Sequence, residues 1–204
     1  MKGALFDLDG VLIDSEGIYY KFWDSIARDY NVGVPDFAMA IKGTNMASIM
    51  AHFAPEDHAE ILRLHTEFQQ NMRFEFFEGA LDFVRILAAH GIPRAVVTSS
   101  EEGKMQQLYA QHPEFPSLFN AIITGDMVTN GKPHPECYLK GAAAIGCDIR
   151  DCYVFEDSLQ GIQAGATAGA TVVGLTTTYP HEIIAPLAHI TIPTLAQASS
   201  ILNS

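Results

Sequence analysis

The chain has 204 residues, of which 48% are hydrophobic and 18% charged, a composition typical of a folded globular protein rather than a disordered one. Its formal net charge of −12 argues against nucleic acid and anionic membrane surfaces as partners. No apolar run approaches the roughly 18 residues of a membrane span, and Asp7 and Asp9 interrupt the N-terminal apolar stretch, so we expect no secretory signal and a cytoplasmic protein.

The first predicted strand, GALF at residues 3–6, ends in two acidic residues. Asp7 and Asp9 have the same parity, so their side chains face the same side as long as strand geometry lasts. Gly10 then permits a sharp turn. Two carboxylates that converge at a strand end suit a metal ion, or a nucleophile paired with a general acid/base. For this motif alone, a turn capped by Asp is an equally open interpretation.

Residues 16–75 show helical spacing with no intervening strand. The segments with this spacing are IYYKFWDSIARDY, NMASIMAHF and HAEILRLHTEFQQNMRF. We therefore expect an inserted all-α helical cap domain at residues 15–78, and an α/β core domain made of residues 1–14 and 79–204. The loops at residues 14–15 and 78–79 would be its hinges. An aromatic stripe at helical spacing is typical of packing, so Trp23 is expected in the cap core.

The rest of the chain alternates between apolar segments and helical patterns. Near-continuous hydrophobicity is typical of strands covered on both faces. Further strands are expected at residues 93–98, 119–124, 152–155, 171–175 and 189–192, and helices near residues 80–90, 101–111, 135–146, 158–168 and 181–187. This alternation predicts an open parallel sheet with right-handed crossovers. Active sites in such sheets lie beyond the carboxyl ends of the strands.

Hydroxyl residues follow the second predicted strand, and a lysine follows the third. Thr98 and Ser99 precede a helical stretch, where hydroxyls and free amides bind phosphate, although they also cap helices without any ligand. Lys132 lies in GDMVTNGKPHPE, fixed by its Gly and Pro neighbours. A P-loop is excluded because five residues, not four, separate the two glycines and proline follows the lysine. A lysine on the surface is the alternative.

Glu156 and Asp157 end the fourth predicted strand. Asp157 could merely cap the helix that begins near residue 158. Gly161, Gly165 and Gly169 recur every four residues along that helix, which predicts close packing of the helix on the sheet.

All four clusters fall at the carboxyl ends of predicted parallel strands. Together they supply carboxylates, hydroxyls and one cation. Mg²⁺ prefers oxygen ligands and takes few of them from protein, which suits Asp7, Asp9 and Asp157. A metal together with Lys132 would also create a local positive site in an acidic protein. The combination indicates phosphoryl transfer.

With these motifs, the sequence resembles the haloacid dehalogenase superfamily over essentially the whole chain. It resembles in particular the superfamily's phosphatases with an inserted helical cap, the group that contains β-phosphoglucomutase. The resemblance implies a Rossmann-like parallel sheet with helices on both faces. It implies that Asp7 is the nucleophile that forms an aspartyl-phosphate, and that Asp9 is the general acid/base.

The resemblance also implies the roles of the other motifs. Thr98 would hold the phosphoryl group with help from Ser99, and Lys132 would bind phosphate and steady the nucleophile. Mg²⁺ would be held by Asp7, the backbone carbonyl of Asp9, and Asp157, with Glu156 alongside.

The cap stretch IKGTNMAS at residues 41–48 resembles the substrate-specificity loop of the mutase. Candidate substrate-binding residues there are Lys42, Gly43, Thr44 and Asn45. The mutase's arginine is replaced by Met46, and its histidine near the first hinge by Tyr19. These departures favour a Mg²⁺-dependent phosphatase of a small phosphorylated metabolite, such as a sugar phosphate. A β-phosphoglucomutase-like isomerase is the alternative, and a catalytically silent binding module is a third. By resemblance we expect a monomer.

Overall fold

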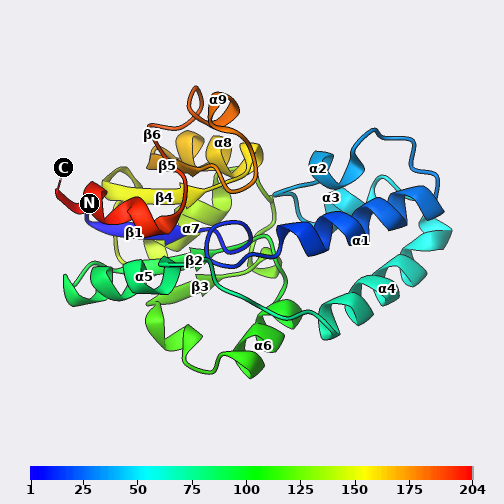
Figure 1. The fold of residues 1–204 in the computed structure, drawn as a ribbon, viewed down its shortest axis with the longest axis horizontal. Coiled ribbons are helices and arrows are strands. Elements are labelled where there is room, and N and C mark those ends of the chain that lie inside the picture. Colours follow the sequence, from blue (N-terminus) through cyan, green and yellow to red (C-terminus); the bar gives the residue numbers. More distant parts are fainter. Residues whose placement is uncertain (204) are drawn as a thin grey trace.

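The computed structural model of the protein describes residues 1–203, in which six parallel strands form one sheet (Figure 1). The strands are β1 (Gly3–Phe6), β2 (Arg94–Val97), β3 (Ala121–Ile123), β4 (Cys152–Glu156), β5 (Thr171–Leu175) and β6 (Ile190–Ile192), in the order β3-β2-β1-β4-β5-β6. The chain builds outward from β1 in one direction and then from β4 in the other. Crevices at such a switch point hold the ligand in open α/β sheets. The predicted α/β class with a Rossmann-like parallel sheet is confirmed.

Helices cover both faces of this sheet because alternate strand residues point to opposite sides. Phe6 and Val96 pack in one apolar cluster with α5 (Ala80–Ala89) and α6 (Glu102–Gln111). Leu5 and Val97 pack in a second cluster with α7 (Glu136–Ala144) and α8 (Leu159–Ala168). The short α9 (His181–Ile184) adds Ile184 to the second cluster. Burial on both faces explains why the strands are almost entirely apolar.

The chain between β1 and β2 leaves the sheet and forms four helices before it returns through α5 (Figure 1). They are α1 (Glu16–Asp29), α2 (Phe37–Ala40), α3 (Met46–Met50) and α4 (His58–Gln70). They enclose an apolar cluster of their own, to which Trp23, Phe37 and Ile61 belong. We call residues 15–78 the cap; its division from the rest of the chain as a separate domain stays a prediction.

Element ends differ from the sequence-based expectation where local backbone chemistry intervenes. Helix α9 ends at Ile184 and not near residue 187, because Pro186 has no amide hydrogen with which to continue the helical hydrogen bonds. Helix α7 stops at Ala144, two residues before Gly146 adopts a positive φ of 70°. Helix α2 was not predicted. It is one turn long and follows Asp36, which has a φ of 48°.

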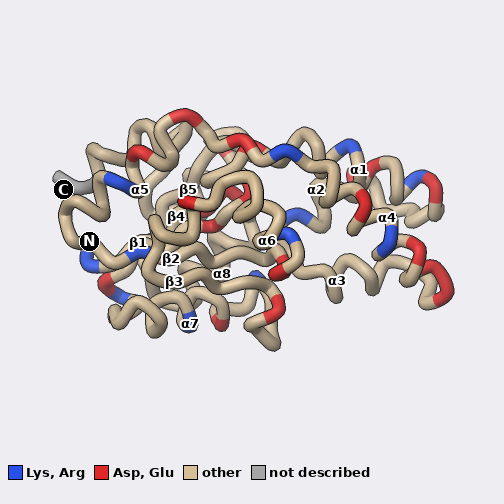
Figure 2. The backbone as a smooth tube through the Cα atoms, turned by 90° about the horizontal axis from the view of Figure 1, so that it is seen from below, with Lys and Arg blue, Asp and Glu red and all other residues tan. Residues whose placement is uncertain are grey.

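Charged residues occur throughout the fold. Acidic residues are distributed along the backbone of both the sheet part and the cap helices (Figure 2). Within residues 1–203, no helix has the length and apolarity needed to cross a bilayer.

Candidate active site

Asp7 directly follows β1, at the crevice between β1 and β4. Its amide donates a hydrogen bond to the carbonyl of Phe155 on β4, 3.0 Å away, which continues the sheet pattern one residue beyond the strand. Gly10 then turns the chain with a φ of 79°. A Cβ at Gly10 would lie 2.1 Å from Oδ2 of Asp157, so the turn and the close approach both require glycine.

Lys132 is buried beside Asp7. Its Nζ donates to Asp7 Oδ1 at 2.7 Å, to Glu156 Oε1 at 2.6 Å and to the carbonyl of Val97 at 3.3 Å. Burial lowers the pKa of Lys132, but Asp7 and Glu156 outweigh it, so the net shift is upward and the side chain stays cationic. Burial raises the pKa of Asp7, and the neighbouring carboxylates add to the rise that Lys132 opposes.

Glu156 is fully buried, and donors occupy both of its oxygens. Oε1 accepts from Lys132 and from the Tyr138 hydroxyl at 2.7 Å. Oε2 accepts from the amides of Asp157 and Ser158 and from the Ser158 hydroxyl, each at 3.0 Å. Glu156 and Asp7 thus hold the Lys132 ammonium between them. That Glu156 also binds the metal directly, as the resemblance implies, stays a prediction.

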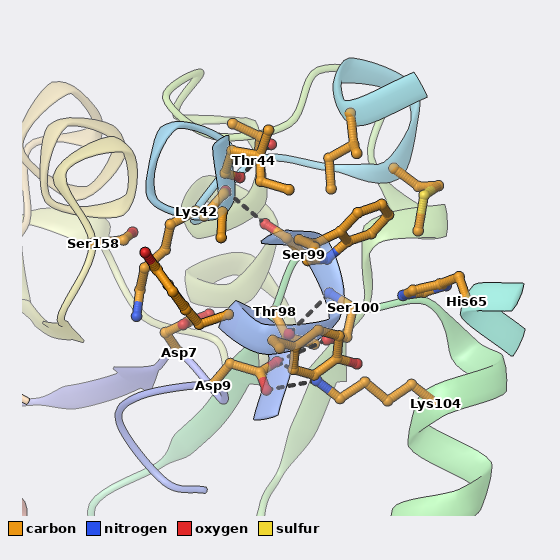
Figure 3. Close-up of a pocket in the computed structure, with 18 of the residues that line it drawn as sticks. Asp7, Asp9, Lys42, Thr44, His65, Thr98, Ser99, Ser100, Lys104 and Ser158 are labelled. Carbon is orange, nitrogen blue, oxygen red and sulfur yellow. Dashed lines mark hydrogen bonds and ion pairs between the residues drawn. The ribbon is translucent and has the colours of Figure 1, made fainter. Parts of the chain in front are cut away.

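Asp9 faces a different set of partners. Its carboxylate accepts from Ser15 and Ser100, the latter at 2.9 Å, and both of its oxygens contact Lys104 Nζ at 2.6 and 2.5 Å. Burial alone would raise the pKa of Asp9, but these donors lower it overall. Asp9 lies between Asp7 and Lys104 in the pocket (Figure 3).

The hydroxyl residues after β2 close one side of the site. Thr98 is buried, and its Oγ1 accepts from the amide of Ser100 at 3.0 Å, so the loop turns back on itself. The Ser99 hydroxyl crosses to the cap and donates to the carbonyl of Gly43 at 3.1 Å (Figure 3).

Asp157 is a fully buried acid that lines the pocket. Its Oδ2 accepts from Thr178 and lies 2.8 Å from Nζ of Lys42, which reaches down from the cap. Its Oδ1 is buried and has no hydrogen-bond partner among the described residues. Burial raises the pKa of Asp157, although Lys42 opposes the rise.

These groups fit a hard divalent cation. Asp7, Glu156 and Asp157 each offer an oxygen, and the three oxygens lie within 4.8 Å of one another. Two ammonium groups, of Lys132 and Lys42, face these three carboxylates, which leaves negative charge to balance. Oxygen-only donors and the unpartnered Oδ1 of Asp157 suit Mg²⁺.

A cavity of about 150 Å³ lies between sheet and cap. Asp7, Asp9 and Asp157 line its floor with the hydroxyl residues Thr98, Ser99 and Ser100. The predicted cap residues Lys42, Gly43 and Thr44 also line it. Asn45 does not. Its side chain accepts from the amide of Ser48 and caps α3, and it lies against Gly131 outside this cavity. Lys132 and Glu156 lie behind Asp7.

Sequence reasoning missed Lys104, the cation that contacts Asp9. The signal was available, because Lys104 lies four residues before Leu108 and so shares the buried face of α6 with it. It also missed His65 and Gln69, which line the cap side of the cavity together with Tyr19. The core role expected for Trp23 agrees with its place in the apolar cap cluster, but Trp23 lines the cavity as well.

Known proteins resemble this chain in sequence and in fold. A profile of the haloacid dehalogenase-like hydrolases matches residues 4–175. Hexitol phosphatase A of Escherichia coli (strain K12) is 33% identical over 184 aligned residues, which cover 85% of this chain and 82% of that protein. A haloacid dehalogenase family hydrolase from Deinococcus radiodurans R1, solved with bound phosphate and sodium, has a TM-score of 0.75 and 28% identity, with 99% of this chain and 95% of the other covered. β-Phosphoglucomutase from Clostridium difficile shares the fold, with a TM-score of 0.82 at 19% identity over 100% of this chain and 96% of the other.

Proposed function

We propose that this chain hydrolyses a small sugar or sugar-alcohol phosphate with Mg²⁺ through an aspartyl-phosphate. The chain belongs to the haloacid dehalogenase-like hydrolases and is a phosphoric monoester hydrolase of that superfamily. The observation that carries the proposal is the position of Asp7. Its carboxylate meets the cavity, while Lys132 holds one of its oxygens from behind at 2.7 Å. A carboxylate fixed in this way can present its other oxygen to phosphorus.

The reaction has two steps. In the first, an Asp7 oxygen bonds to phosphorus and the ester P–O bond breaks. Asp9, which must be protonated in the substrate complex although its donors favour the ionised form in the free protein, gives its proton to the departing alcohol oxygen. In the second, water bonds to phosphorus as Asp9 takes up a proton from it, and the bond to Asp7 breaks to release phosphate. Asp7 and Asp9 therefore return to their starting states.

Other residues bind and orient the phosphoryl group. Thr98, Ser99 and Lys132 would contact its oxygens. Asp7, Asp157 and the backbone carbonyl of Asp9 would hold Mg²⁺, with Glu156 beside them. The bound ion would supply positive charge that offsets the charge of the transferring group.

The cap supports a leaving group of modest size that carries no second phosphate. Lys42 reaches Asp157 at the phosphoryl end of the cavity, whereas the far wall contains neutral side chains such as Tyr19, Trp23 and Met46. Met46 and Tyr19 stand where the resemblance to the mutase places an arginine and a histidine, so the arginine's charge would be missing for a second phosphate. The Lys104 ammonium beside Tyr19 is already paired with Asp9. This favours hydrolysis over isomerisation.

Phosphate release from a panel of esters, with and without Mg²⁺, tests the proposal. The panel holds hexitol phosphates, hexose phosphates, nucleoside monophosphates, phosphoglycolate and pyrophosphate. We expect Mg²⁺-dependent release from hexitol or hexose phosphates. Conversion of a glucose 1-phosphate to glucose 6-phosphate, with a trace of the bisphosphate and without free phosphate, would establish the mutase instead. Absence of any turnover would leave a binding module.

Asp7→Asn tests the nucleophile. A neutral amide cannot form the acyl phosphate, so we expect turnover to vanish while the thermal unfolding midpoint stays near that of the native protein. Asp151→Asn is the matched control, because Asp151 is a surface acid paired with Lys2 at 3.0 Å. More than trace phosphate release by Asp7→Asn would refute the assignment.

A further inference from the structure

Lys104 is a buried cation that the proposed reaction does not use. Its side chain is 2% exposed, although it belongs to α6, whose neighbouring residues Glu102 and Gly103 are exposed. Taking an ammonium group out of water costs several kcal/mol unless a partner compensates. The carboxylate that pairs with Lys104 is Asp9, with both oxygens within 2.6 Å of Nζ. The buried Lys104 ammonium thus pairs with the Asp9 carboxylate at the cavity.

The Lys104 ammonium also contacts the cap. It lies 4.4 Å from the ring centroid of Tyr19 on α1, a cation–π distance. The Tyr19 ring packs edge-on against Phe68 at 5.1 Å, and its hydroxyl accepts from Gln69 at 3.1 Å. Both partners of Tyr19 belong to α4, so Lys104 contacts a ring that joins the two long cap helices, α1 and α4.

Asp9 is therefore held from three directions. Ser15, at the start of the cap, donates to one oxygen, and Ser100, after β2, donates to the other. Lys104 contacts both oxygens. An acid/base group must meet the leaving oxygen within hydrogen-bond reach, so small errors in its placement are costly.

We propose that Lys104 is a positioning residue, which orients the Asp9 carboxylate for proton transfer and, through the Tyr19 ring, makes that orientation depend on the docked cap. The inference rests on the proposed function, in which Asp9 carries the proton. Lys104 touches no reacting atom in this role and acts through Asp9.

Leaving-group chemistry separates this role from simple packing. An alkyl phosphate needs its leaving oxygen protonated, whereas p-nitrophenolate departs readily without a proton. For Lys104→Met, we expect first-turnover cleavage of a hexitol phosphate to slow at least about tenfold, within the roughly 10²–10⁴-fold worth of general acid/base catalysis. Its KM should stay within about threefold. The first-turnover burst from p-nitrophenyl phosphate should slow much less.

A double-mutant cycle gives the sharper test. In an Asp9→Asn background, Lys104→Met should add almost nothing, because residues that act as a unit are strongly non-additive. Tyr19→Leu should show the same pattern as Lys104→Met with a smaller loss. Lys104→Arg keeps the charge and should restore part of the rate if Lys104→Met folds poorly. Lys2→Met, which removes an exposed ammonium paired with Asp151, is the control.

Three results would overturn the positioning role in an active wild-type enzyme. The first is that Lys104→Met reduces the rate by the same factor in the wild-type and Asp9→Asn backgrounds. The second is that Lys104→Met raises KM and leaves kcat unchanged. The third is that Lys104→Met leaves the kinetics with both esters unchanged. The second would show that Lys104 binds the substrate directly. A wild-type protein that cleaves no ester would instead overturn the proposed function, and the positioning role with it.

Discussion

His65 is a histidine whose surroundings keep its ring uncharged. It is 8% exposed on α4, and its ring stacks on Trp23 with centroids 5.4 Å apart. Burial and the nearby Lys104 ammonium lower the pKa of His65 to about 4. The cavity wall formed by this residue is therefore neutral at physiological pH, in agreement with an uncharged leaving group.

This environment predicts a pH-dependent stability. The unfolded chain binds a proton at this imidazole below about pH 6.5, whereas the folded protein does so only near pH 4. The unfolded state thus holds more protons between these values, so the free energy of unfolding falls as pH drops through that window. His65→Phe keeps a ring beside Trp23 and removes the titration.

Between pH 7 and pH 5, we expect the free energy of unfolding of the native protein to fall by up to about 2 kcal/mol more than that of His65→Phe. Urea unfolding at the two pH values measures this difference. His181→Phe, at an exposed position, controls for the change in composition. Equal losses in the native protein and His65→Phe would contradict the low pKa.

At the residue scale, sequence reasoning found groups whose chemistry is unusual for their position. An acid or lysine at the end of an apolar strand signals a site, which is why Asp7, Lys132 and Asp157 could be located and do converge at one crevice. Lys104 escaped notice because lysines on helices are usually solvated. Asn45 was assigned to substrate by its neighbours in sequence, but helix capping turns its side chain away.

At the element scale, α8 shows how one helix serves both packing and the site. Gly165 faces the sheet, where a Cβ would lie 3.0 Å from Val154. Gly169 instead ends the helix with a φ of 94°. Gly161 lies against the Glu156 carboxylate, and a Cβ there would be 1.7 Å from Oε1. Gly161 and Gly165 thus both pack closely on β4, as predicted, whereas Gly169 serves to end the helix.

Gly161→Ala should disturb the site through this contact. Because Glu156 is fully buried and bound to Lys132, we expect the added methyl to lower the free energy of unfolding by about 1–3 kcal/mol and to reduce phosphate release. Gly103→Ala in α6 is the matched control. A Cβ there meets nothing within 4 Å, so the helix should gain up to about 1 kcal/mol. Urea unfolding of both variants measures the two opposite shifts, and a neutral Gly161→Ala would contradict the packing argument.

Elements were predictable in proportion to their length and periodicity. The six strands and the helices that cover the sheet follow from apolar runs and helical spacing, with errors of a few residues at Pro and Gly. The single-turn helix α2 did not, since its sequence FAMA contains no polar residue and so shows no amphipathic period. Cap loop geometry is equally hidden, because contacts such as that of Ser99 with the Gly43 carbonyl join residues 56 positions apart.

At the scale of the whole molecule, cap and sheet meet where the charges are. Lys42 contacts Asp157, Ser99 contacts the cap backbone, and Lys104 bridges Asp9 and Tyr19. These contacts gather acids into one crevice of a chain that already carries a net charge of −12. Self-repulsion of this kind opposes the compact state, so a cation bound in the crevice should stabilise the entire fold.

Mg²⁺ should therefore raise the thermal unfolding midpoint. An ion that binds only the folded state contributes about 2.7 kcal/mol at 100 times its Kd, or roughly 5–10 °C for a chain of this size. The buried Oδ1 of Asp157 offers a ligand position while Lys42 stays on Oδ2, so Asp157→Asn should abolish most of the shift. Asp151→Asn, at the surface, should keep it. Scanning fluorimetry of chelator-treated protein with added Mg²⁺ makes the comparison. An undiminished shift in Asp157→Asn would place the ion elsewhere.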